Sequence, residues 1–201
     1  MAAVEFFFDC SSPWTYLGFE ALCVAAREDG FDVCFRPFLV GGVFNTVNPS
    51  VYEARAAVHS PKTRYFWKDM QDWIARSGLA IKFPPSIFPI NSARAMRVCL
   101  LAADAGSCEP VARRIFQLYW SEDRDIADPG VLAEACSAGG LDPAATLEAA
   151  DSPELKTRLR ANTDEIIARG GFGTPTFYVG GDDMYFGQDR IGLVREAMAR
   201  G

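Results

Sequence analysis

The order in which hydrophobic patterns change along the chain restricts the fold more than any other feature. Residues 4–8 form a short, almost continuous apolar run, which is typical of a buried strand in a parallel sheet. Residues 14–30 then space their apolar side chains as an amphipathic helix does, and residues 31–37 alternate as a second strand that ends at a proline. A strand, a helix and a strand within so short a stretch predict one parallel β-α-β unit rather than two domains.

Helical patterns dominate the middle of the chain, and strand patterns return at its end. Gly41-Gly42 predicts a loop at the start of the helical region, and the three prolines of residues 83–89 predict an extended loop within it. A capping residue followed by proline starts helices at positions 128, 142 and 152, and about six helices are predicted between residues 41 and 169. Residues 176–179 and 184–186 then predict two strands joined by a glycine turn, with one last helix after them.

This order of elements predicts an α/β protein with a thioredoxin-like domain, whose β-α-β and β-β-α halves are interrupted by an all-α helical insertion. We expect residues 1–40 and 170–201 to form the thioredoxin-like domain. Residues 41–169 are expected to form the inserted helical domain.

Composition excludes several classes of protein. A chain of 201 residues, of which 49% are hydrophobic, is long enough to bury a large core, which excludes a disordered chain. The 26 acidic residues outnumber the 20 basic ones without any basic run, which argues against nucleic-acid binding. Six cysteines without a C-x-x-C pair, together with one histidine, argue against a zinc site.

The first residues lack the pattern of a signal peptide and no apolar run is long enough to span a membrane, so a cytoplasmic location is expected.

Ser12 is the first candidate functional residue, because it stands where the first strand gives way to a helix. A hydroxyl there lies at the positive end of the helix, beside unpaired backbone N–H groups that suit a phosphate, carboxylate or thiolate. Helix capping is the more ordinary explanation of a serine at this position. In thioredoxin-like folds the junction holds a reactive cysteine, whereas a serine can only hydrogen-bond a thiolate that another molecule supplies. Ser11 is a second hydroxyl beside it, and the sequence leaves open which of the two would do so.

Two segments near the end of the chain are further candidates. Pro175 begins a strand at the place of the cis-proline of thioredoxin-like folds, and a cis bond would leave the backbone groups of Thr174 free to pair with a peptide-like ligand. Gln188 and Asp189 begin the last helix. Asp189 either caps that helix or binds the ammonium group of a zwitterion whose carboxylate contacts backbone N–H groups.

These three segments together resemble a known family. Residues 8–20 are similar to its F-D-x-x-S-P-[YFW]-x-x-L pattern, residues 173–177 to its G-x-P-T-F pattern, and residues 186–190 to its F-G-x-D-R pattern. The family is 2-hydroxychromene-2-carboxylate isomerase, with the kappa-class glutathione transferases as close relatives. The resemblance extends over nearly the whole chain.

The resemblance implies that glutathione is the cofactor and that specific residues bind it. Ser12 would face the glutathione sulfur and act as the catalytic residue. Thr174 would pair through its backbone with the cysteinyl part, ahead of Pro175. The remaining glutathione contacts implied are Gln188 and Asp189 on the γ-glutamyl end, and Lys62 near the glycyl carboxylate or the acidic substrate.

The resemblance also implies where a second substrate would bind. Asn45 or Asn48 and Asn91 fall in segments that border it, although Asn91 is better explained as a cap of the following helix. Trp14 stands where a tyrosine or phenylalanine is commoner, which would narrow the mouth of the site. His59, the only histidine, is expected to be a loop residue rather than a general base.

The activity implied is the glutathione-dependent interconversion of 2-hydroxychromene-2-carboxylate and trans-o-hydroxybenzylidenepyruvate, in the breakdown of naphthalene-type aromatic compounds, by a homodimer. A kappa-like glutathione transferase or peroxidase remains the alternative, and a non-catalytic glutathione-binding module is a weaker one. A disulfide oxidoreductase is disfavoured by Ser12 and by the missing C-x-x-C pair. The side chains of Tyr65, Phe66, Trp73 and Phe88 suit a flat aromatic substrate, although stripes at helical spacing more often form core.

Overall fold

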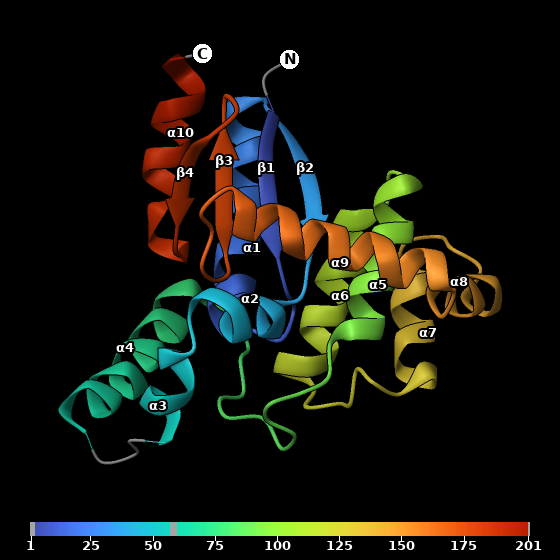
Figure 1. Ribbon diagram of the computed structural model, residues 1–201, viewed down its shortest axis with the longest axis horizontal. Coiled ribbons are helices and arrows are strands. Elements are labelled where there is room, and N and C mark those ends of the chain that lie inside the picture. Colours follow the sequence, from blue (N-terminus) through green and yellow to red (C-terminus); the bar gives the residue numbers. More distant parts are fainter. Residues whose placement is uncertain (1–2, 57–59, 201) are drawn as a thin grey trace.

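A mixed sheet joins the two ends of the chain. The computed structural model describes residues 3–56 and 60–200, and within them the strands are β1 (Ala3–Phe8), β2 (Asp32–Pro37), β3 (Thr176–Val179) and β4 (Asp183–Phe186). Their order across the sheet is β2-β1-β3-β4, with β2 parallel to β1 and with β3 antiparallel to both β1 and β4 (Figure 1). The predicted β-α-β and β-β-α halves therefore form one thioredoxin-like sheet.

One face of the sheet carries the first and last long helices. These are α1 (Pro13–Asp29) and α10 (Ile191–Arg200), and Phe6 and Phe8 of β1 point toward this side. The two rings stack with their centroids 5.2 Å apart, and Phe6 also contacts Phe19 of α1 at 6.4 Å. Successive side chains of β1 point to opposite faces of the sheet, so this one short strand can contact helices on both faces.

The opposite face is covered by α2 (Val40–Val47) and α9 (Pro153–Ala168), and α9 crosses the sheet in Figure 1. Phe7 of β1 points to this side and is fully buried with Val43 of α2 and Ile166 of α9. The last helix of the predicted insertion thus packs directly on the sheet. The division into two domains stays a prediction.

The helical region contains more helices than the sequence predicts. Eight α-helices lie between β2 and β3 in the described residues, against about six expected there from the sequence. Besides α2 and α9 they are α3 (Ser50–Ala56), α4 (Pro61–Ser77), α5 (Ala93–Asp104), α6 (Cys108–Phe116), α7 (Pro129–Ala138) and α8 (Pro143–Ala150), and a π-helical turn (Gln117–Ser121) follows α6. The capping residues predicted at Asp128, Asp142 and Ser152 all accept backbone N–H groups of their helices.

The loop predicted at Gly41-Gly42 is wrong, because both glycines lie inside α2. A Cβ atom on Gly42 would lie 2.9 Å from the Thr163 side chain of α9. The glycine is therefore explained by the close approach of two helices far apart in the sequence, which no local pattern can reveal.

Candidate functional site

Ser12 is the N-cap of α1, as the sequence predicts. Its backbone is extended, with φ −110° and ψ 126°, and its hydroxyl oxygen accepts a hydrogen bond from the Thr15 N–H at 3.4 Å. The side chain is partly exposed, and α1 has no acidic residue in its first turn. The first-turn N–H groups and the Ser12 hydroxyl together form a donor set that suits an anion.

The loop that precedes β3 is attached to the start of α1. The Thr174–Pro175 peptide bond is cis. The Thr174 hydroxyl lies 2.8 Å from the Thr15 hydroxyl and accepts the Asp9 N–H at 3.3 Å. Thr15 and Thr174 are both buried, so these bonds hold two segments together that are 159 residues apart.

The turn that precedes α10 meets the same place. Gln188 and Asp189 lie in a 3-10 turn, and the Gly187 N–H donates to the Pro175 carbonyl at 3.1 Å. A Cβ atom on Gly18 of α1 would lie 3.0 Å from the Pro175 ring and 3.4 Å from the Gln188 side chain. The glycine allows the helix, the proline loop and the turn to pack together, with Gln188 partly buried and Asp189 exposed.

A buried carboxylate lies behind this junction, and sequence reasoning did not select it. Asp9 is 1% exposed, and its oxygens accept the N–H groups of Ser11 and Val40, each at 3.0 Å. Burial raises the pKa of the Asp9 carboxyl above its ordinary value, against the opposing effect of these bonds and of the Ser92 hydroxyl. The only sequence signal was its place in the F-D-x-x-S-P pattern, which does not show that the side chain is buried.

The arrangement of these elements matches a known domain over almost its whole length. Residues 3–199 match the DSBA-like thioredoxin domain. The chain belongs to this family.

Relatives of this DSBA-like protein include two kinds of enzyme. Glutathione S-transferase kappa 1 of Homo sapiens is 26% identical over 203 residues, which cover 95% of this chain and 88% of that protein. The 2-hydroxychromene-2-carboxylate isomerase of Pseudomonas putida is 27% identical over 205 residues, which cover 98% of this chain and 94% of that protein. The resemblance that the sequence motifs indicated is therefore confirmed.

Solved structures agree with the fold. A 2-hydroxychromene-2-carboxylate isomerase superposes with a TM-score of 0.84 and 25% identity over 98% of this chain and 95% of that one. The cytosolic disulfide reductase DsbM of Pseudomonas aeruginosa with GSH superposes with a TM-score of 0.66 at 19% identity, over 98% of this chain and 96% of that one, and shows likeness of fold alone.

In this DSBA-like chain, α4 packs an aromatic ring against the start of α1. Trp14 meets Phe66 edge to face, with ring centroids 5.9 Å apart. Lys62 precedes Phe66 by one helical turn and shares its face, so the exposed ammonium group belongs to the side of α4 that meets α1.

The aromatic stripe of α4 is not core, contrary to the usual origin of such stripes. Met70 is the buried residue that the structure assigns to this helix, whereas Tyr65 is 63% and Phe66 40% exposed. Further rings continue the surface toward Trp120. Neighbouring centroids lie 4.9 Å apart for Trp67 and Phe83, 5.9 Å for Phe83 and Phe88, and 6.4 Å for Phe88 and Trp120. The Trp120 indole N–H donates to the Cys10 carbonyl at 2.9 Å, which fixes this end of the ring series beside the Ser12 turn.

The three asparagines considered for the second substrate all have partners within the protein. Asn45 accepts the Tyr52 hydroxyl at 2.7 Å, and Asn48 donates to the Phe172 carbonyl at 3.1 Å. Asn91 accepts the Ala93 N–H at 3.1 Å, which is the capping contact that the sequence favoured. Their contact with a substrate stays a prediction. His59 lies outside the described residues.

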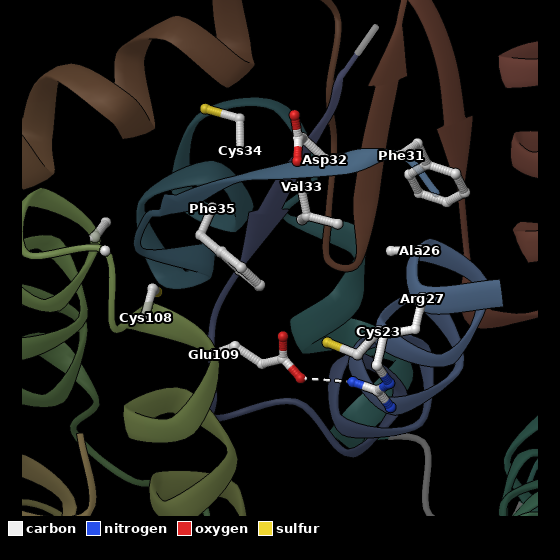
Figure 2. A pocket seen from close by; sticks show the side chains of 12 residues that line it. Cys23, Ala26, Arg27, Phe31, Asp32, Val33, Cys34, Phe35, Cys108 and Glu109 are labelled. Atoms are coloured by element: carbon white, nitrogen blue, oxygen red, sulfur yellow. Dashed lines mark hydrogen bonds and ion pairs between the residues drawn. The ribbon is translucent and has the colours of Figure 1, made fainter. Parts of the chain in front are cut away.

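A pocket of about 420 Å³ lies elsewhere, between the end of α1, β2 and the start of α6 (Figure 2). Cys23, Cys34 and Cys108 are among its lining residues, although the Cys34 thiol points to the other side of β2, and an ion pair between Arg27 and Glu109 at 2.8 Å crosses one side. Burial raises the pKa of Cys23 to about 12 and that of Cys108 well above its ordinary value, so both thiols stay protonated. None of the predicted site residues lines this pocket, which is separate from the Ser12 junction.

Two further searches concern only the described part of the chain. There, no group of histidine, cysteine and acidic side chains is arranged to hold a metal ion. No described helix is long and apolar enough to cross a membrane.

Proposed function

We propose that this protein is a glutathione-dependent isomerase that interconverts 2-hydroxychromene-2-carboxylate and trans-o-hydroxybenzylidenepyruvate. The observation that carries the proposal is the junction of three segments, where α1, which Ser12 caps, packs on the Pro175 loop through Thr15 and on the Gln188 turn through Gly18. The names of the isomerase and transferase relatives support the same class of chemistry.

The residues at this junction fit glutathione along its length. The donors at the start of α1 suit the sulfur in its thiolate form, because no acidic residue in the first turn of that helix opposes a negative charge there. The backbone of Thr174 would pair with the cysteinyl part, and the exposed carboxylate of Asp189 beside Gln188 would bind the γ-glutamyl ammonium group. Lys62, one turn before Phe66, would bind the glycyl carboxylate or the carboxylate of the substrate.

The chemistry needs a soft nucleophile and free rotation about a former double bond. Glutathione, held by Ser12, Thr174, Gln188 and Asp189, would supply a thiolate as a reversible nucleophile. Ser12 donates a hydrogen bond to the sulfur, and the α1 dipole stabilises its negative charge, which lowers the pKa of the thiol. The Lys62 ammonium group stabilises the enolate charge that develops on the pyruvoyl group.

The exposed aromatic rings provide a surface for a flat substrate. Trp14 and Phe66 form its edge beside α1, and the ring series continues to Phe88. Asn45, Asn48 and Asn91 would act at its border. The proposal includes a homodimer, which the family resemblance implies, and the cytoplasmic location that the sequence patterns predict.

A kappa-class-like transferase or peroxidase that uses the same thiolate on another electrophile is the second candidate. The observation that favours it is the near-complete match to glutathione S-transferase kappa 1, at an identity similar to that of the isomerase. The two candidates share the Ser12 site and differ in the substrate that meets it.

The test compares wild type, Ser12→Ala and the matched control Ser11→Ala. Isomerisation of 2-hydroxychromene-2-carboxylate is followed by absorbance with and without glutathione. We expect turnover that requires glutathione and falls at least about tenfold in Ser12→Ala, or roughly 1.4 kcal/mol of transition-state stabilisation, with a smaller loss in Ser11→Ala.

Other outcomes lead to other conclusions. An equal or larger loss in Ser11→Ala would reassign the role between the two serines. Calorimetric glutathione binding without turnover would favour the transferase, or a binding module if a panel of electrophiles also failed. Absence of glutathione binding would refute the site assignment.

A further inference from the structure

The buried carboxylate of Asp9 connects the segments that form the junction. Its side chain accepts the N–H of Ser11 in the turn that presents Ser12, and the N–H of Val40 at the start of α2. Its own backbone N–H donates to the Thr174 hydroxyl at 3.3 Å. The Ser92 hydroxyl, just before α5, also acts on the carboxylate and lowers its pKa. Asp9 therefore holds the turn in register with α2 through its side chain and with the Pro175 loop through its backbone.

This carboxylate lacks the partner that usually accompanies a buried charge. Among the described residues, backbone N–H groups and serine hydroxyls act on this carboxylate, and no cationic side chain forms an ion pair with it. The titratable groups close enough to interact with it are Cys10 and Tyr119, and burial raises the pKa of both, so they are neutral at ordinary pH. An uncompensated charge in such a place is unfavourable for folding alone and is more typical of a functional site.

We propose that Asp9 is a positioning residue of the thiolate site and that its ionisation makes the site respond to pH. The inference rests on the proposed use of glutathione. In the ionised form, the two carboxylate oxygens accept the N–H groups of Ser11 and Val40. Protonation converts one acceptor into a donor, so the turn that holds Ser12 loses a constraint.

The charge has a second effect, of known sign. A negative carboxylate close to the Ser12 turn disfavours a second negative charge on the bound sulfur. Wild type should therefore lose activity in acid through two ionisations, that of Asp9 and that of the thiol. Because burial raises the pKa of Asp9, its ionisation falls nearer to neutral pH than that of an exposed aspartate.

The test uses Asp9→Asn and measures the thiol directly. Ultraviolet absorbance of the thiolate is titrated against pH in the glutathione complex, and kcat/KM is measured over the same range. In Asp9→Asn we expect the thiol pKa to fall by at least about half a unit, because the like charge is gone. The acid limb of kcat/KM should show one ionisation instead of two, and kcat should fall, because the asparagine amide cannot accept both N–H groups.

Ser92→Ala provides an independent variant that keeps the charge. It removes a hydrogen bond that lowers the pKa of Asp9, so the Asp9 ionisation should move to higher pH by about half a unit while the thiol pKa stays the same. The control is Ser107→Ala, a partly buried serine before α6 whose hydroxyl contacts the Ala102 carbonyl beside the separate pocket. It should leave both ionisations in place.

The results separate this inference from the proposed function. In one outcome, wild type binds glutathione while both variants keep the wild-type pKa of the bound thiol and the wild-type fall of kcat/KM in acid. In that case the inference about Asp9 is refuted and the proposed function stands. If Asp9→Asn does not fold, an unmoved limb in Ser92→Ala is sufficient to refute it. If wild type does not bind glutathione, both proposals fail.

Discussion

The pair of hydroxyls that joins α1 to the Pro175 loop should contribute measurably to stability. Thr174→Val keeps the shape of the side chain but removes its hydroxyl. The buried Asp9 N–H then loses its acceptor at 3.3 Å, and the buried Thr15 hydroxyl loses its partner at 2.8 Å. Because an unsatisfied buried group costs about 1–3 kcal/mol, we expect the free energy of unfolding to fall by roughly 2 kcal/mol or more.

The double variant tests the reasoning. Thr15→Val alone should cost roughly 1 kcal/mol, because the Thr174 hydroxyl still accepts the Asp9 N–H. The double variant Thr15→Val/Thr174→Val removes both hydroxyls, so no Thr15 hydroxyl remains without a partner. The free energy of unfolding should therefore fall by about 0.5–2 kcal/mol less than the sum of the two single losses. Urea denaturation followed by circular dichroism gives the free energy of unfolding of wild type, the two single variants and the double variant.

The refuting result is additivity. If the two single losses add within error, or if Thr174→Val is neutral, the hydroxyl pair does not hold the loop to the helix. Glutathione affinity of Thr174→Val, measured by calorimetry, should fall only severalfold, because the ligand would pair with the Thr174 backbone, which remains.

Two further predictions concern ionisation and thiol reactivity. The bonds from Lys82 and Ser86 lower the pKa of Asp123 to about 2, so they stabilise the fold above pH 4 and lose that contribution as pH falls toward 2. Asp123→Asn, which tolerates the φ of 57° there, should therefore be less stable than wild type at pH 7 and approach it at pH 2 in thermal melts. Cys34 is the exposed member of the six cysteines and the other five are buried, so Ellman's reagent should modify one thiol rapidly in the folded protein and the rest after unfolding. In the control variant Cys34→Ser no thiol should react rapidly. Rapid modification of any thiol in this variant would contradict the burial of the other five cysteines.

Local sequence patterns were sufficient for the elements whose signals lie within a few residues. The apolar run of β1, the capping serine and proline that begin α1, and the capping residues Asp128 and Asp142 predict their own secondary structure correctly. The three motifs that carry the family resemblance were also readable, because each is a continuous segment. The parallel pairing of β1 with β2 followed from the succession of elements, since the strands of a β-α-β unit run parallel.

Features that depend on distant segments could not be read in this way. Gly41-Gly42 looks like a loop, and only the approach of Thr163 explains why α2 carries a glycine there. The stripe of aromatic residues on α4 looks like core, and only the missing cover over Tyr65 and Phe66 shows that it is surface.

The same division applies to the candidate site. The sequence by itself determined Ser12 as a helix cap and placed Pro175 and Gln188 at element boundaries. Only the tertiary structure decided that these segments meet, through the hydroxyls of Thr15 and Thr174, and that Asp9 is buried behind them. The physical reason is that capping and periodicity arise from bonds between near neighbours in the chain. Burial and the ionisation of a carboxylate depend on everything that packs around it.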